Sequence, residues 1–83
     1  MNMNINVGDV LSVKTSALFN EYILSLGSKY IKINICVPFL VVKVLQYETT
    51  MASVVNLRVL TTTGLIGNVC FCFADLEKVI EKQ

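Results

Sequence analysis

The feature that most constrains the fold is the C-terminal third of the chain, residues 54–79. It holds two runs rich in β-branched and aromatic residues, 54–61 and 65–73, joined by a Thr-rich link that ends in Gly64. Such runs are typical of strands, and a glycine between them permits the positive φ of a tight hairpin turn. The segment therefore predicts an antiparallel hairpin, the unit from which small barrels close.

Three earlier segments also carry strand patterns. Residues 10–14 follow the turn signal Gly8-Asp9, residues 29–35 alternate between isoleucine and polar positions, and residues 39–47 form the longest β-rich run. Residue 67 is a glycine on the apolar side of the last long strand, where it predicts a bend. We expect a mainly β fold, a small five-stranded barrel, in one domain that spans residues 1–83.

The segment between Thr15 and Gly27 has two interpretations. Leu18, Tyr22 and Leu26 recur at a spacing of four, and Gly27 could end a short helix. The alternative is an extended arm over residues 22–26 that turns at Gly27-Ser28 into the next strand. The helix is the slightly favoured expectation. Beyond residue 73, Asp75 is placed to cap one helical turn that lowers Leu76 onto the end of the barrel.

The chain is more apolar than its size requires. Hydrophobic residues make up 54% and charged residues 16% of the 83 positions, against a usual charged share of about 25%. So small a domain has little interior. The surplus is either scattered singly over the surface or gathered in a patch that a partner covers.

The strongest patch candidate is the run 39–47, which is apolar on both faces. We expect Leu40, Val42 and Val44 to face the core, which leaves Phe39, Val41 and Leu45 on the opposite, exposed face. Tyrosines are enriched in interfaces and add three further candidates. The predicted partner-binding residues are Tyr22, Tyr30, Phe39, Val41, Leu45 and Tyr47.

Charge gives a second possibility. The formal net charge is only +1, which argues against a partner as polyanionic as duplex DNA. Between residues 22 and 74, however, Lys29, Lys32, Lys43 and Arg58 stand against Glu48 alone. They are either the polar positions of solvated strands or, with Tyr30 or Tyr47 for stacking, a track for single-stranded nucleic acid.

The residues needed for catalysis are sparse. The chain has no histidine, and its three cysteines, Cys36, Cys70 and Cys72, do not supply the four ligands of a structural zinc site. Most acidic residues stand in turns or near the C-terminus. We expect a protein that is not an enzyme, binds no cofactor or metal, and keeps its thiols reduced.

Neither a signal peptide nor a membrane span is expected. The first six residues are rich in asparagine, with neither a positive charge nor an apolar run. The longest apolar run, residues 35–42, contains Pro38 and falls short of the roughly 20 residues that a membrane helix needs. The expected location is the cytoplasm, which for a viral protein is that of the host.

The order of these parts resembles the small SH3-like β-barrel proteins of phage and bacterial type. The resemblance rests on Gly8-Asp9 and the strand that follows, on residues 39–45, on residues 57–71 around Gly64, and on Asp75-Leu76-Glu77. Residues 15–17 lack the glycines of the RNA-binding KOW barrels, and the chain lacks the tryptophan of peptide-binding SH3 domains. The resemblance therefore implies a fold and not a function.

The expected function is that of a small binding module, a phage or bacterial accessory protein that engages a host protein, or a second copy of itself, through an exposed apolar strand face. The alternative is an SH3-like or KOW-like nucleic-acid-binding module.

Overall fold

Seven antiparallel strands and a short helical segment make up the computed structural model, which describes residues 4–14, 20–47 and 54–83. The strands are β1 (Val10–Val13), β2 (Glu21–Leu26), β3 (Lys29–Asn34), β4 (Phe39–Tyr47), β5 (Val54–Thr61), β6 (Ile66–Cys72) and β7 (Ile80–Lys82). A 3₁₀ turn, η1 (Phe73–Asp75), and the short helix α1 (Leu76–Val79) connect β6 to β7.

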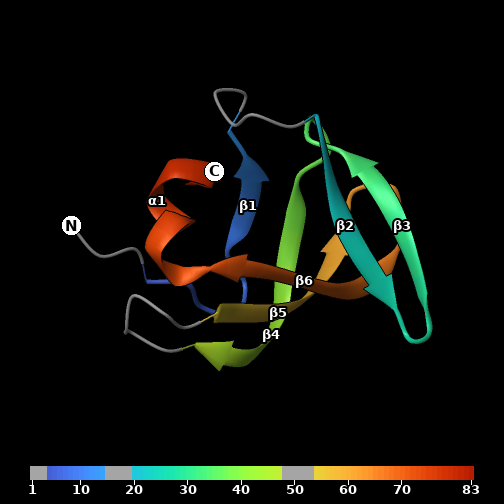
Figure 1. Ribbon diagram of the computed structural model, residues 1–83, viewed down its shortest axis with the longest axis horizontal. Coiled ribbons are helices and arrows are strands. Elements are labelled where there is room, and N and C mark those ends of the chain that lie inside the picture. The colour runs from blue at the N-terminus through green and yellow to red at the C-terminus, as the bar shows by residue number, and fades with distance from the viewer. Residues whose placement is uncertain (1–3, 15–19, 48–53) are drawn as a thin grey trace.

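The strands form one curled, barrel-like sheet in the order β3-β2-β6-β5-β4-β1-β7. Its centre is a meander in which β5 pairs along most of its length with both β4 and β6. Figure 1 shows the β2–β3 hairpin at one side of the molecule and β1 with α1 at the other. The mainly β class is confirmed, with seven strands in the described residues rather than the five expected.

Of the two additional strands, β7 follows α1, and β2 lies in the segment for which a short helix was the favoured expectation. Residues 21–26 are not helical but form β2, which pairs over its whole length with β3 around a turn at Gly27 (φ +67°). The hairpin alternative was therefore the correct one. Two isoleucines on β3 and alternating apolar positions on β2 give both strands an inner face. Residues 15–19 of the expected helix lie outside the described residues.

The faces of β4 are the reverse of those expected over residues 39–42, whereas Val44 faces the core as expected. Phe39 and Val41 are completely buried in the core, whereas Val42 is exposed. The ladder with β5 then shifts register between Val41 and Lys43, which marks a β-bulge. A bulge interrupts strict alternation, so that Val44 packs against the same core as Val41. Simple alternation along residues 39–47 could not reveal this shift.

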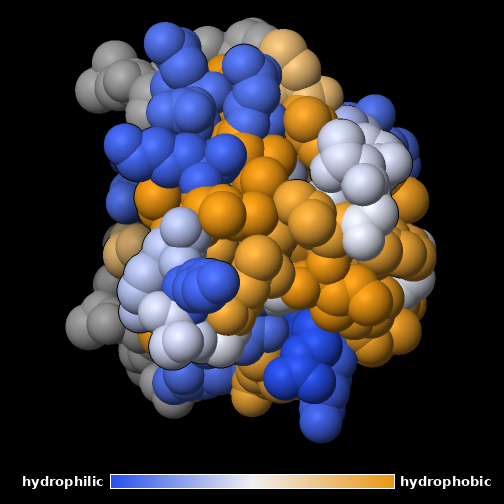
Figure 2. All heavy atoms as spheres, turned by 90° about the vertical axis from the view of Figure 1, so that its right-hand side faces the viewer, coloured by the Kyte–Doolittle hydropathy of each residue, from blue (hydrophilic) through white to orange (hydrophobic). Residues whose placement is uncertain are grey.

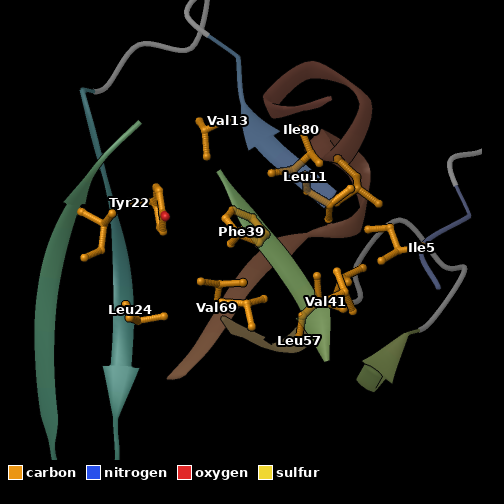
Figure 3. Close-up of a cluster of buried hydrophobic side chains, with 14 of the residues drawn as sticks. Ile5, Leu11, Val13, Tyr22, Leu24, Phe39, Val41, Leu57, Val69 and Ile80 are labelled. Carbon is orange, nitrogen blue, oxygen red and sulfur yellow. The ribbon is translucent and has the colours of Figure 1, made fainter. Parts of the chain in front are cut away.

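The core draws side chains from every strand. Figure 3 shows Phe39 at its centre, with Tyr22 and Leu24 of β2 pointing towards it from one side and Leu11 of β1 lying on the other. The side chains that are fully buried are Phe39, Leu11, Leu24, Leu57, Leu76, Ile80, Val41, Val55, Val59 and Val69. Burial of this apolar surface is the main stabilising contribution, at roughly 25 cal/mol per Å².

Gly67 allows β2 to approach β6 closely. A Cβ atom at this position would lie 2.6 Å from the backbone oxygen of Ser25 and 2.7 Å from the side chain of Leu24. Any other residue here would hold the two strands apart. Gly67, where a bend was expected, is thus the point at which β2 and β6 come closest, and the register shifts lie in the β4–β5 ladder.

The C-terminal segment closes the sheet next to β1. Asp75 occupies the N-cap position of α1, without a side-chain capping hydrogen bond, and Leu76 is buried as expected. Strand β7 pairs with β1 through residue 82, and the Gln83 amide donates to the Val10 carbonyl at 2.8 Å. No helix in the described part of the chain is both long and apolar enough to cross a membrane.

Candidate functional site

The candidate site is a cleft between β2 and β6, with a volume of about 360 Å³. We call it the β2–β6 cleft. Figure 2 views the molecule from the side of β2 and β3 and shows hydrophobic residues gathered in the middle of this face, with hydrophilic residues above and below. The residues that line the cleft are Glu21, Tyr22, Ile23, Ser25, Tyr30, Asn68, Cys70 and Phe71.

The cleft exists because β2 and β6 separate after a single contact. Their ladder consists of one pair, Ser25 opposite Asn68, next to the close approach at Gly67. From there β2 continues along its hairpin partner β3, while residues 69–72 of β6 have, among the described residues, ladder partners on β5 alone. Within this part of the chain, one edge of β6 is therefore open beside the cleft.

Aromatic rings of the core form the floor of the cleft. Tyr22 and Phe71 both contact Phe39, with ring centroids 5.4 and 6.4 Å apart. The Tyr22 hydroxyl donates a hydrogen bond to the Val37 carbonyl at 2.9 Å, and burial raises the pKa of Tyr22 to about 12. This floor is tightly packed, so it provides a preformed apolar surface.

The rim of the cleft is exposed and mixed in character. Tyr30 is 72% exposed and Ile23 is 49% exposed. Ser25 and Asn68 offer hydrogen-bonding groups at one end, and Glu21 offers a carboxylate on β2. An apolar cleft with a few polar groups is typical of a binding site. The exposed Cys70 thiol also lines it and is not disulfide-bonded.

Two cations lie beside the Ser25–Asn68 end of the cleft. Arg58 stands opposite Asn68 in the β5–β6 ladder, and its Nε donates to the Asn68 Oδ1 over a long 3.4 Å. On the other side of Arg58, Lys43 is its partner in the β4–β5 ladder. A row of outward-facing residues thus crosses five strands: Lys43, Arg58, Asn68, Ser25 and Tyr30.

The predicted partner-binding residues fall into three groups. Tyr22 and Tyr30 both line the cleft, the first in its floor and the second on its rim. Phe39 and Val41 are completely buried, so they cannot form the exposed face that was expected of them. Leu45 is partly exposed on β4, and Tyr47 packs edge-on against Phe73 at 5.8 Å, away from the residues that line the cleft.

The predicted basic residues are all exposed, but they do not form one track. Lys43 and Arg58 are neighbours on β4 and β5, whereas Lys29 and Lys32 lie on β3. Lys32 stands opposite Ile23, which belongs to the cleft. Among residues 4–14, 20–47 and 54–83, no cluster of three or more metal-binding side chains occurs.

Most residues of the cleft could not be identified from the sequence. Ile23, Ser25, Asn68 and Phe71 carry no motif, and Glu21 and Cys70 resemble ordinary solvent-facing strand positions. The one useful signal was Gly67, a glycine on the apolar face of a strand, which is typical of a close approach by another backbone. It marks where the cleft begins.

Comparison with protein-family models, curated protein sequences and solved structures finds no match to this chain.

Proposed function

We propose that this chain is a small, non-enzymatic binding module that holds an extended segment of a partner protein in the β2–β6 cleft. The observation that carries the proposal is the opening of the ladder after the Ser25–Asn68 pair, which leaves a strand edge beside an apolar cleft. An added strand gains affinity from backbone hydrogen bonds and specificity from pockets for alternate side chains.

The dimensions and chemistry of the cleft support this function. Its volume of about 360 Å³ falls within the usual range of roughly 300–1,000 Å³ for binding pockets. The packed aromatic floor suits an apolar side chain, and the exposed ring of Tyr30 supplies contact area with few rotatable bonds. The sequence suggested Phe39 and Val41 as the binding face, but both are buried. The proposed site is instead the β2–β6 cleft, whose rim is exposed.

A relationship to SH3-like barrels is part of the proposal. Without the β2–β3 hairpin, five strands remain, in the order β6-β5-β4-β1-β7. Five is the number of strands that the resemblance implies. The hairpin is then an insertion between the first and second strands of such a barrel, and it creates the cleft. A phage or bacterial accessory protein that engages a host protein is the corresponding biological role.

The test is selection from a library of displayed random peptides of about twelve residues. We expect the wild-type protein to enrich peptides with alternating apolar residues. Ile23→Ser removes an apolar side chain from the rim and should weaken their binding. The matched control is Ile66→Ser, because Ile66 is equally apolar and 60% exposed but does not line the cleft.

Failure to enrich any peptide would contradict the proposal, as would enrichment that both substitutions weaken equally. Circular dichroism and urea denaturation of both variants establish that they are folded before binding is compared. Both side chains are exposed, so each change in the free energy of unfolding should be within about 0.5 kcal/mol.

A second candidate function is the binding of single-stranded nucleic acid, and the row of outward-facing residues favours it. Lys43 and Arg58 could contact phosphates, and Tyr30 at the other end of the row could stack on a base. Fluorescence anisotropy with oligo(dT) and oligo(U) at low salt tests this function. No binding at about 100 µM, which corresponds to roughly −5.5 kcal/mol, would exclude it.

A further inference from the structure

The β2–β6 cleft has a basic end. Lys43 and Arg58 face each other directly in the β4–β5 ladder, and like charges in this position destabilise a sheet. Within the described part of the chain, neither of them forms an ion pair with a carboxylate. An anion bound between them would relieve this repulsion.

Arg58 is positioned to turn towards such an anion. Its hydrogen bond to the Asn68 Oδ1 is 3.4 Å long, beyond the usual range of about 2.7–3.2 Å. A weak bond of this kind is readily exchanged for a charge-assisted bond to a carboxylate, which arginine forms with particular strength. Asn68 lines the cleft, so the guanidinium lies next to the space that a bound segment would occupy.

The opposite end of the cleft has one charge of each sign, Glu21 on β2 and Lys32 on β3. Glu21 begins β2, four residues before Ser25, the residue that pairs with Asn68. At about 3.3 Å per residue, these ends are roughly 13 Å apart along the strand. That distance accommodates four or so extended residues. Two cations stand at one end, whereas Glu21 and Lys32 offset each other at the other end. This difference gives the cleft a direction, with the anionic end of a bound segment placed beside Arg58.

We propose that the occupant of the cleft is an extended protein segment in which alternating apolar residues are followed by acidic ones, with the acidic end at Arg58 and Lys43. This inference rests on the proposed function and specifies the partner's chemistry. A peptide fits better than a nucleic acid because its amide backbone can pair with the open edge of β6.

The experiment uses the full chain and three fluorescein-labelled, C-terminally amidated peptides. They share an extended core of alternating Thr and Val and end in Asp, Asn or Lys residues. An oligo(dT) of about twelve nucleotides is the fourth probe. Anisotropy is measured for the wild type, for Arg58→Gln, and for the cleft variant Ile23→Ser with its control Ile66→Ser.

We expect the Asp peptide to bind at least about threefold more tightly than the Asn peptide, and the Lys peptide to bind most weakly. Arg58→Gln should remove most of the difference between Asp and Asn, and added salt should reduce it. Ile23→Ser should weaken the binding of all three peptides, and Ile66→Ser should leave it unchanged.

The outcomes separate this inference from the proposed function. If the three peptides bind equally and Ile23→Ser weakens them all, the acidic partner is wrong and the peptide-binding function stands. If only oligo(dT) binds, and Arg58→Gln weakens it, both are overturned in favour of nucleic acid. If no probe binds, the acidic partner is refuted, while the library selection decides the function independently.

Discussion

The Tyr22 hydroxyl offers a sensitive test of the packing beneath the cleft. Tyr22 is 3% exposed, and its hydroxyl donates to the Val37 carbonyl at 2.9 Å. Tyr22→Phe keeps the ring and removes only this hydrogen bond. We expect the variant to fold and to lose about 0.5–1.5 kcal/mol of unfolding free energy near neutral pH, the net value of one such bond.

The effect of the same substitution on the unfolding free energy should disappear at high pH. Burial raises the pKa of Tyr22 from 10.0 to about 12 in the folded protein. The neutral phenol is therefore favoured by folding, and its contribution is complete below pH 10 and is lost as the pH rises towards 12. By linkage, the wild type loses about 1.4 kcal/mol through this group by about pH 11. The phenylalanine variant has no such loss.

The assay is urea denaturation of both proteins, under reducing conditions, at intervals from about pH 7 to pH 11. The difference between their unfolding free energies should shrink from about 1 kcal/mol to near zero. Tyr30→Phe is the matched control, because Tyr30 is 72% exposed. This substitution should leave the unfolding free energy unchanged at both ends of the pH range. A difference that stays constant over this range would refute the buried, hydrogen-bonded placement of Tyr22.

Three further predictions concern the rest of the fold. Gly67→Ala should cost about 1–3 kcal/mol and increase amide hydrogen exchange at the β2–β6 contact, because the new Cβ would lie 2.6 Å from the Ser25 oxygen. Phe39→Ala should cost about 3–5 kcal/mol in urea denaturation; a loss below about 0.5 kcal/mol would place its side chain outside the core. Asp9→Asn should flatten the acid side of the stability profile, since the hydrogen bond from the Asn6 amide lowers the pKa of Asp9 from 3.8. That contribution is present above pH 3.8 and lost as the pH falls through the folded pKa.

Local patterns in the sequence predicted the strands well. The runs at residues 10–14, 39–47 and 54–61 became β1, β4 and β5, and the link ending in Gly64 turns with φ at +92°. These predictions succeeded because β-branched residues and turn glycines favour particular backbone conformations at their own positions. The faces predicted for residues 39–42 were wrong, and that of Val44 was right, because a bulge between them shifts side chains without changing the composition of the strand.

The candidate site was much less predictable, since it depends on contacts between distant segments. Nothing near residue 25 indicates that it pairs with residue 68, and the single β2–β6 pair is what creates the cleft. Tyr22 was expected to be an exposed anchor and instead forms the cleft floor. Its burial follows from β2 lying over the core, and the mixed helix and strand signals of residues 15–27 did not determine that position.

The β2–β3 hairpin is tied to the rest of the molecule at both of its ends. Near the turn, Ser25 pairs with Asn68; towards the base, Tyr22 and Ile33 are buried in the core. Because the hairpin is fixed at two points, the width of the β2–β6 cleft stays nearly constant. A ligand that enters would have little chain to immobilise, which lowers the entropic cost of association. Differences in affinity among ligands would then arise mainly in how fast they dissociate.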